Sequence, residues 1–522
     1  MVSSLAINVM SVRSKPIVEK PRFRPKMWFL LAGTVLAGVV ATFAFGALSG
    51  IFGVIPPEPE IVRNGAARII KVAPGGNVEA AIAKAESGDI VELQAGAVYY
   101  GEIKLPNKPL KDFVTIQSSN VGSLAPGKRV TPAQRSSMAT IATRDPGRPA
   151  VSATNGANHY RFIGIEFTSS IAEYNYALVT FGEGETAANL PHDLEIDRSY
   201  IHPFKSGVVR RGIALNSAAT VIKNSYIEGF GFPGEETQGI CGWTGTRNVS
   251  VLNNYIEGGA ENVLFGGGDP SSADLVPMDI EVRGNHLNKP EKWATGVTVK
   301  TLFQLKNAKR VQVIGNLMTN NWVGEAMRVT VRNQDNTATF STIEDVVIKD
   351  NVIDTAGAGI NILGTDDTYP SQIMKRLTIE NNLFTNIANG GKVQGSGYFI
   401  QIADGENITI ANNTVFNKGN ITSFHGVPPR AFAFRDNIVG HGDYGIHGLD
   451  DIKSPQSRAM FQRNIFINLN RVSPVDYSFP IGNTIVSGIS DVGFVNPASK
   501  DFRLSPVSRF AGKGSNLAAN NE

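Results

Sequence analysis

The chain has 522 residues, with 49 lysines and arginines against 46 aspartates and glutamates, and a single cysteine, Cys241. Six of the bases and only one acid fall within residues 1–26, so the rest of the chain carries 43 bases and 45 acids. This nearly neutral body lacks the basic excess typical of a nucleic-acid-binding protein. One cysteine also excludes a disulfide framework and a cysteine-rich zinc site.

The basic tail leads into a predicted membrane segment. Residues 27–55 are 29 consecutive uncharged and mostly apolar residues, whereas a membrane span needs about 20. This length favours a retained transmembrane anchor over a signal peptide cleaved near Ala47–Ser49, because a signal peptide has a shorter apolar core. The basic flank predicts that residues 1–26 are cytoplasmic and that everything after Ile55 lies outside the cytoplasm. A proline-rich linker is expected at 56–67.

A short capping helix is predicted at the start of the body. Residues 77–88 have an amphipathic pattern in which Asn77 caps the start and Gly88 marks the stop. A strand-like run follows at residues 89–93.

The body consists of repeats. Segments of the form apolar-x-apolar-x-Asn-x-apolar recur at intervals of 24 to 35 residues, which is typical of a β-solenoid. One column of the aligned repeats holds a polar side chain in every copy, so it can hydrogen-bond from coil to coil, and Asn tolerates the left-handed backbone that such turns need. The column contains Ser199, Ser225, Asn254, Asn285, Asn316, Asn351, Asn382, Asn413, Asn437 and Asn464.

A second short strand often follows a glycine after this column, as at residues 212–215 and 359–362. Alternation predicts that Arg328, Asn361, Gln401 and His447 point outward from these strands. The predicted fold class is all-β: a single-stranded right-handed parallel β-helix of about ten or more coils over residues 68–515, followed by a disordered tail at 516–522.

The residues at both ends of this body resemble a known superfamily. The run VAPGGNVEAAIAKAESGDIVELQAGAVYYGEI looks like the opening of right-handed parallel β-helix proteins of the pectate-lyase type, and it is similar to the start of the chondroitinase-B/alginate-lyase family. Residues 493–515 resemble the closing segment of many secreted bacterial β-helix proteins. The resemblance implies that an acidic polysaccharide binds along the outer face of a parallel sheet and is cleaved by β-elimination or hydrolysis.

The catalytic motifs of the superfamily are absent, so the fold alone assigns no reaction. Residues 239–335 nevertheless combine the longest loops with Trp243, Trp293 and Trp322, the three tryptophans outside the anchor. Sugars stack on exposed aromatic rings, and loops on a rigid scaffold often carry function. These tryptophans are therefore candidate substrate-binding residues, although tryptophans that plug the ends of coils are the structural alternative.

Lyase chemistry needs a cation that neutralises a uronate carboxylate and a base that takes the neighbouring proton. Arg328 or Arg332 could clamp the carboxylate, and Lys300 or His286 could be the base. Lys306, Asn361 and Gln401 complete the predicted binding residues.

Hydrolysis stays open as an alternative, because Glu261 and Glu325 are placed two coils apart, at the edge of the range for an inverting pair. No metal site is predicted. Asp269, Asp274 and Asp279 could hold calcium, but their spacing matches no calcium loop, and a solvated loop is the better interpretation.

Two functions remain open. The favoured one is a membrane-anchored extracytoplasmic enzyme that binds and cleaves polysaccharide, by β-elimination rather than hydrolysis. The alternative is a non-catalytic β-helix that binds polysaccharide or serves as a surface scaffold.

Overall fold

The computed structural model describes residues 57–64, 67–205, 207–389, 391, 393–442, 445–448, 458–467 and 480–514. Contacts divide the chain into two units, Met1–Ile55 and Pro56–Glu522. The predicted cytoplasmic tail, the membrane segment at 27–55 and the tail at 516–522 lie outside the described residues. Within the described ranges, no helix is long and apolar enough to cross a membrane.

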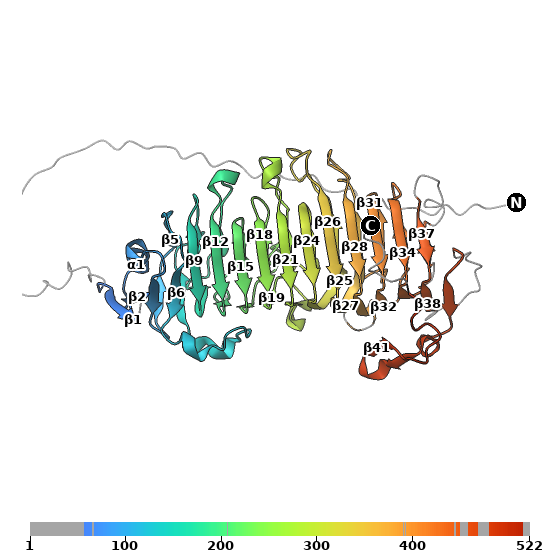
Figure 1. Ribbon diagram of the computed structural model, residues 1–522, viewed down its shortest axis with the longest axis horizontal. Helices are drawn as coiled ribbons and strands as arrows, with labels where there is room; N and C mark the ends of the chain where they lie inside the picture. The colour runs from blue at the N-terminus through green and yellow to red at the C-terminus, as the bar shows by residue number, and fades with distance from the viewer. Residues whose placement is uncertain are drawn as a thin grey trace, which may run out of the picture. The chain divides into compact units, whose positions relative to one another are not determined.

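The second unit is a parallel β-helix whose strands form long hydrogen-bonded ladders (Figure 1). The strands of sheet A lie side by side across Figure 1, and the sheet is parallel throughout apart from its first strand. Its strands are β1 (Glu60–Asn64), β2 (Ala67–Val72), β3 (Ile90–Leu93), β6 (Val114–Ser118), β9 (Asn158–Ile163), β12 (His192–Asp197), β15 (Ala218–Lys223), β18 (Arg247–Leu252), β21 (Met278–Arg283), β24 (Ala308–Ile314), β26 (Ile343–Lys349), β28 (Lys375–Glu380), β31 (Glu406–Ala411), β34 (Arg430–Arg435) and β37 (Met460–Gln462).

Sheet B comprises two ladders that run along the same coils. Ladder B1 follows the turn after each sheet A strand, and ladder B2 comes next in each coil. Ladder B1 contains β4 (Val98–Tyr100), β7 (Ala139–Thr143), β10 (Ile165–Ser169), β13 (Tyr200–Ile201), β16 (Tyr226–Ile227), β19 (Tyr255–Glu257), β22 (His286–Asn288), the first parts of β25 (Leu317–Thr330) and β27 (Val352–Leu363), β29 (Leu383–Ile387), β32 (Thr414–Asn417), β35 (Ile438–Gly440), β38 (Ile465–Ile467) and β39 (Thr484–Val486). Ladder B2 contains β5 (Ile103–Leu105), β8 (Val151–Ala153), β11 (Asn175–Phe181), β14 (Val209–Leu215), β17 (Gln238–Gly242), β20 (Glu261–Phe265), β23 (Thr301–Leu305), the second parts of β25 and β27, β30 (Ile400–Ala403), β33 (Thr422–Phe424) and β36 (Ile446–His447).

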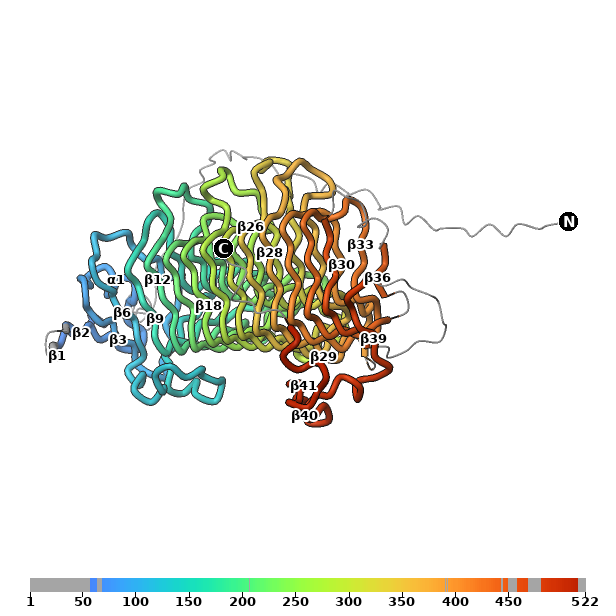
Figure 2. The backbone as a smooth tube through the Cα atoms, turned by 45° about the vertical axis from the view of Figure 1, so that its right-hand side comes forward, coloured from blue at the N-terminus to red at the C-terminus, as the bar shows by residue number. Residues whose placement is uncertain are grey.

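The remaining elements lie at the ends of the column and in its loops. They are α1 (Val78–Lys84), the 3₁₀ turns η1 (Val121–Ser123), η2 (Pro132–Ser137), η3 (Ala187–Asn189), η4 (Ala273–Leu275), η5 (Glu291–Ala294), η6 (Ile489–Val492) and η7 (Pro497–Ser499), and the antiparallel pair β40 (Phe494–Asn496) and β41 (Asp501–Leu504). Figure 2 shows the coils stacked behind one another, with β40 and β41 at the lower edge.

The first coil confirms the capping helix and corrects two boundaries. Asn77 caps α1, and its side chain accepts a hydrogen bond from Ala80 N at 2.9 Å. The helix ends at Lys84 rather than at Gly88, because Ala85 takes an extended conformation and Gly88, with φ +82°, forms the next turn. The predicted linker at 56–67 contains strand β1, which pairs antiparallel with β2, so this stretch belongs to sheet A.

The predicted polar column is a continuous ladder of buried amides. Asn285 N donates to Asn316 Oδ1 at 2.9 Å, and Asn285 Nδ2 donates to the same oxygen at 3.0 Å. Asn483, which the predicted column does not include, extends the ladder, because its Oδ1 accepts a hydrogen bond from Asn464 Nδ2 at 2.8 Å. The expected left-handed backbone belongs to the residue before the column, such as Asn253 with φ 53°. The column residue itself therefore directs its amide along the column axis.

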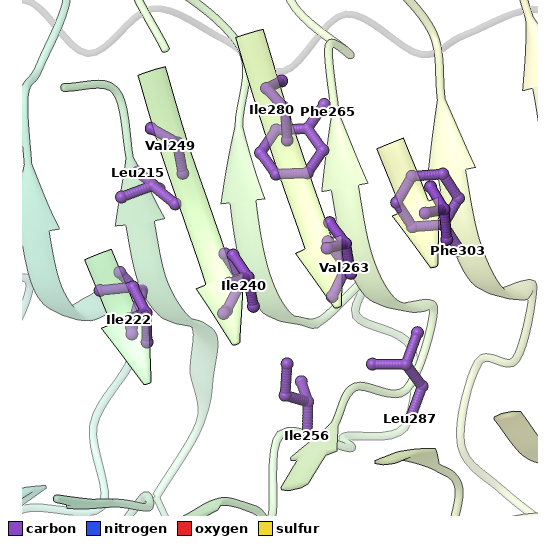
Figure 3. Close-up of a cluster of buried hydrophobic side chains, with 14 of the residues drawn as sticks. Leu215, Ile222, Ile240, Val249, Ile256, Val263, Phe265, Ile280, Leu287 and Phe303 are labelled. Atoms are coloured by element: carbon purple, nitrogen blue, oxygen red, sulfur yellow. The ribbon is translucent and has the colours of Figure 1, made fainter. Parts of the chain in front are cut away.

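The interior is a single stack of aliphatic and aromatic side chains. Ile240, Val263 and Phe303 come from successive strands of ladder B2 and face Ile256 and Leu287 from ladder B1 (Figure 3). All five are fully buried, and burying such a side chain contributes about 1.5–3 kcal/mol. The stack holds the coils in register, so side chains that point outward from a ladder lie in straight rows.

Candidate functional site

A polar pocket of about 360 Å³ opens on the outer face of ladder B2, across β23, β25 and β27. It combines lysines and arginines from two adjacent coils with an amide and carboxylates from the next. Its lining residues include Lys300, Gln304, Lys306, Arg328, Thr330, Arg332, Asn333, Gln334, Asn361, Asp366, Thr368 and Tyr369.

Strand register brings the cations of this pocket together. Gln304 pairs with Arg328, and Arg328 pairs with Asn361, so these three side chains form one outward row. Lys300 immediately precedes β23 and Lys306 immediately follows it. The predicted outward direction of Arg328 is confirmed, because its neighbours Met327 and Val329 are fully buried.

Three of the four cations are paired with carboxylates of this chain. Lys300 forms a salt bridge with Glu236, and Arg332 forms one with Asp367. Both carboxylate side chains are exposed, at 49% for Glu236 and 59% for Asp367. An exposed pair contributes little free energy, about 0–1 kcal/mol, so an incoming carboxylate can displace Glu236 or Asp367 at small cost. Arg332 also lies 3.8 Å from the buried carboxylate of Asp366.

Arg328 is held more firmly. Its Nε donates to Glu325 Oε2 at 2.8 Å, and Tyr398 donates its hydroxyl to the other oxygen of Glu325 at 2.7 Å. Burial favours the neutral form of Glu325, but the charge of Arg328 and these hydrogen bonds hold the pKa of Glu325 below its ordinary value. Glu325 is therefore ionised and orients the guanidinium.

Lys306 differs from the other three cations. Its Nζ donates to Gln334 Oε1 at 3.3 Å, and it has no salt bridge within the described part of the chain. Burial lowers the pKa of Lys306 below its ordinary value, and the negative charge of Glu261 offsets part of that effect. Lys306 is thus the cation of the pocket that most readily becomes a neutral amine.

A single aspartate of a neighbouring loop holds the loop that lines one side of the pocket. Asp269 accepts hydrogen bonds from the backbone N–H groups of Gln334, Asp335 and Thr337 at 2.6, 2.9 and 3.0 Å. Burial opposes ionisation, but these bonds hold the pKa of Asp269 below its ordinary value. The carboxylate therefore fixes the loop that carries Arg332 and Gln334.

The structure places His286 elsewhere, so the prediction that it lies with Lys300 and Arg328 is wrong. His286 points outward from β22 in ladder B1, where its Nε2 lies 2.9 Å from Thr319 Oγ1. Burial, with a smaller contribution from the charge of Arg129, lowers the pKa of His286 to about 4. Outward residues of ladders B1 and B2 open on different faces of the coil.

Glu261 pairs with Thr301 of the next coil and alternates in step with the inward Val263, so its side chain is only 1% exposed and does not line the pocket. Its Oε2 accepts from Gln238 Nε2 at 2.9 Å. Below it, the ammonium of the fully buried Lys289 donates to Gly258 O at 2.6 Å and Gly259 O at 2.7 Å. Glu261 is therefore an enclosed carboxyl group rather than a group that contacts substrate.

The three tryptophans do not form one platform, contrary to the prediction. Trp293 and Trp322 are 6% and 4% exposed, and Trp293 packs on Gly231 beside ladder B1. Trp243 is half-buried, and the guanidinium of Arg211 covers its ring at 4.7 Å. These positions match the structural alternative, in which tryptophans plug the coils.

The polar row continues beyond the pocket to Gln401, which pairs with Asn361 and has its Nε2 3.4 Å from His425 Nε2.

Two of the possible calcium ligands already have partners within the chain. The carboxylate of Asp269 accepts the hydrogen bonds from the loop described above, and the carboxylate of Asp279 accepts one from Arg310 Nε at 2.6 Å. A different set of side chains of metal-ligand type comes together on sheet A, namely His159, His192 and Asp193.

No family model matches this chain, and no curated protein matches its sequence. Among solved structures, the alginate lyase from Paenibacillus sp. str. FPU-7 matches at 14% identity over 76% of this chain and 98% of that chain, with a TM-score of 0.31. The A-module of the mannuronan C-5 epimerase AlgE6 from Azotobacter vinelandii matches at 11% identity over 74% of this chain and 94% of that chain, with a TM-score of 0.45. The Streptococcus pneumoniae surface protein and adhesin PfbA matches at 11% identity over 78% of this chain and 94% of that chain, with a TM-score of 0.39.

Matches at this level carry no information about the activity of this chain. Its own parallel ladders and coil register define the fold, which is the parallel β-helix typical of pectate-lyase-like proteins.

Proposed function

We propose that this protein is a membrane-anchored, extracytoplasmic β-helix that binds an acidic polysaccharide across β23, β25 and β27 and cleaves it by β-elimination. One observation carries the proposal: Lys300, Lys306, Arg328 and Arg332 line a single pocket in a body with no overall excess of positive charge. Asn361 adds a hydrogen-bonding amide for sugar hydroxyls in the next coil.

In this proposal, Arg328 and Arg332 neutralise the carboxylate of one uronate residue, which acidifies the proton on the carbon next to it. Arg328 offers its Nη1 side, because Glu325 occupies the Nε and Nη2 side. The neutral amine of Lys306 takes the proton, since burial lowers its pKa. This assigns to Lys306, expected only to bind substrate, the role expected for Lys300 or His286.

The electron pair of the broken C–H bond forms the new carbon–carbon double bond, and the glycosidic C–O bond breaks. The leaving oxygen takes a proton from Lys300, which is an ammonium in its salt bridge with Glu236. Although the two lysines flank β23, both side chains line the same pocket, where one would accept a proton and the other donate one.

The test uses the full-length protein purified in mild detergent and incubated with alginate, polygalacturonate and glycosaminoglycans. Ultraviolet absorbance detects the unsaturated uronate that elimination leaves on the product. We expect one of these polymers to give a signal that Lys306→Ala abolishes. Lys349→Ala is the matched control, because Lys349 lies on sheet A and not at the pocket.

A non-catalytic binding role is the second candidate, and the ion pairs of the pocket favour it. Because three of its four cations already bind carboxylates of this chain, the pocket can hold a glycan without supplying free charge for catalysis. Retained binding of a polyuronate with no unsaturated product from any polymer would support this role and refute the lyase.

A further inference from the structure

A larger groove, of about 1040 Å³, lies on the outer face of ladder B1. It crosses successive coils, with Thr140, Thr168, His202, Glu228 and Glu257 contributed in chain order. Adjacent coils are about 4.8 Å apart, so five coils give the groove a length of about 19 Å between the first and the last. Its direction across the strands suits an extended linear ligand.

The floor of the groove presents two carboxyl groups in adjacent coils. Glu228 accepts the hydroxyl of Tyr200, while Glu257 accepts the hydroxyl of Tyr255 at 2.7 Å and Gly229 N–H at 2.9 Å. Glu257 is only 5% exposed. Burial, helped by the charge of Glu228, raises the pKa of Glu257 above its ordinary value despite these hydrogen bonds. The pair therefore offers both a hydrogen-bond acceptor and, when Glu257 is protonated, a donor.

Apolar surface lies beside these polar groups. Phe204 is 44% exposed and Tyr100 is 48% exposed, and both line the groove. Trp293, from η5, packs on Gly231 at the other end of the groove and is mostly buried. Small-molecule sites typically combine aromatic walls with a few polar groups in this way.

Residues 119–138, named here the strap, reach the groove through Arg135. Leu124, Val130 and Met138 of the strap pack against Tyr200 on ladder B1. Arg135 of the strap donates to Glu166 at 2.7 Å, so its charge is neutralised within the groove wall. The strap thus contributes one lining residue to the groove, and that residue adds no free cation.

The groups that remain give no excess of cations. The exposed Lys205 and Lys292 stand against three carboxyl groups, those of Glu228, Glu257 and the exposed Glu291. A polyanion finds no excess of cations here, in contrast to the pocket on ladder B2. Hydroxyl groups, rather than carboxylates, therefore match the polar groups of the floor.

We propose that the groove on ladder B1 is a second saccharide site that binds an uncharged oligosaccharide, with Glu228 and Glu257 bonding its hydroxyls and Phe204 contacting its apolar face. This site is independent of the pocket on ladder B2 and of its proposed chemistry. The protein would then hold a neutral glycan on one face and an acidic one on another.

The experiment is isothermal titration calorimetry of the full-length protein in detergent with maltohexaose, cellohexaose and laminarihexaose. At least one of these neutral hexasaccharides is expected to bind. Phe204→Ala and Glu228→Gln should each raise its Kd about tenfold, because they remove an apolar contact and a charged hydrogen-bond acceptor. Circular dichroism melting curves establish that both variants remain folded.

Two controls separate this site from the other pocket. Tyr176→Ala removes an aromatic side chain that is 60% exposed and lies outside the groove, and it should leave the Kd unchanged. Lys306→Ala should also leave the Kd unchanged, whether or not the protein proves to be a lyase. Absence of binding by all three hexasaccharides, or binding that only Lys306→Ala weakens, would overturn the proposal.

Discussion

Arg328 and Glu325 lie three residues apart in β25 and form a salt bridge with its shortest contact at 2.7 Å. A strand residue three positions away ordinarily points to the opposite face. Here the register of β25 with β27 shifts between Asn321 and Glu325, and the two charged side chains meet although Ala326 and Met327 between them are fully buried. This irregularity lets a carboxylate orient the central cation of the pocket from within the same strand.

Replacing Arg328 tests the role of this pair. If Arg328 neutralises the uronate carboxylate, Arg328→Ala should lower kcat/KM on the polyuronate by about 10²–10³-fold. Arg328→Lys should recover only part of the loss, since an ammonium lacks the planar fork with which a guanidinium binds a carboxylate through two parallel N–H groups. The matched control is Arg283→Ala, on sheet A beside Glu281. Equal losses in both alanine variants would contradict a specific role for Arg328.

The pH dependence of cleavage tests Lys306. A base must be neutral to accept a proton, and burial lowers the pKa of Lys306. Activity should therefore rise with increasing pH, with its midpoint below the ordinary lysine pKa of about 10.4. Lys306→Arg should abolish this rise of activity with pH, because arginine stays protonated. A wild-type profile of kcat/KM that falls from pH 6 to pH 9 would be inconsistent with a lysine base.

His286 should make the fold sensitive to acid. Its pKa is about 4 in the folded chain, whereas the unfolded chain takes up this proton near 6.5. The unfolded state therefore binds more protons between these values, and the free energy of unfolding falls as the pH drops from 6.5 to 4. Because His286 is partly exposed, we expect a loss of about 1–2 kcal/mol.

The measurement for His286 is denaturant unfolding at a series of pH values, with His286→Asn as the comparison. Subtracting the two curves removes the contributions of the other titrating groups. A difference that is flat between pH 6.5 and 4 would show that His286 does not couple to folding.

The amide ladder predicts a graded loss of stability. Asn316 donates through Nδ2 to Val282 O and to Asn351 Oδ1, both at 2.9 Å, and its Oδ1 accepts from Asn285. Asn316→Ala leaves these buried groups unpaired and should cost about 2–4 kcal/mol. Asn316→Ser should cost less, because Ser225 occupies the same column and accepts from Ser199 N at 3.1 Å. Thermal unfolding should give the highest melting temperature for the wild-type protein, a lower one for Asn316→Ser and the lowest for Asn316→Ala. Equal melting temperatures would refute a stabilising ladder.

The repeat could be read from the sequence because it depends on local pattern. Each coil places an apolar alternation and one Asn at the same turn, and this pattern requires no knowledge of distant contacts. It predicted the ladder from Ser199 to Asn464 and the outward direction of Arg328. It missed Asn483, where the spacing from Asn464 shortens to 19 residues.

The site was only partly predictable. Lys300, Lys306, Arg328, Arg332 and Asn361 were all named from the sequence, and they line one pocket because strand register stacks their coils. His286 and Trp293 were grouped with them because they are near in sequence. Each coil turns a full circle, however, so neighbours in sequence can open on different faces.

The sequence by itself determined the solenoid, its amide column and the concentration of surplus positive charge in residues 1–26, since these follow from composition and period. Only the tertiary structure decided which charges share a pocket, which are buried and which are paired. Those properties depend on register between coils and on loops such as the one that Asp269 holds. In the described part of the near-neutral body, four cations therefore gather in the pocket on ladder B2, while the groove on ladder B1 has no excess of cations.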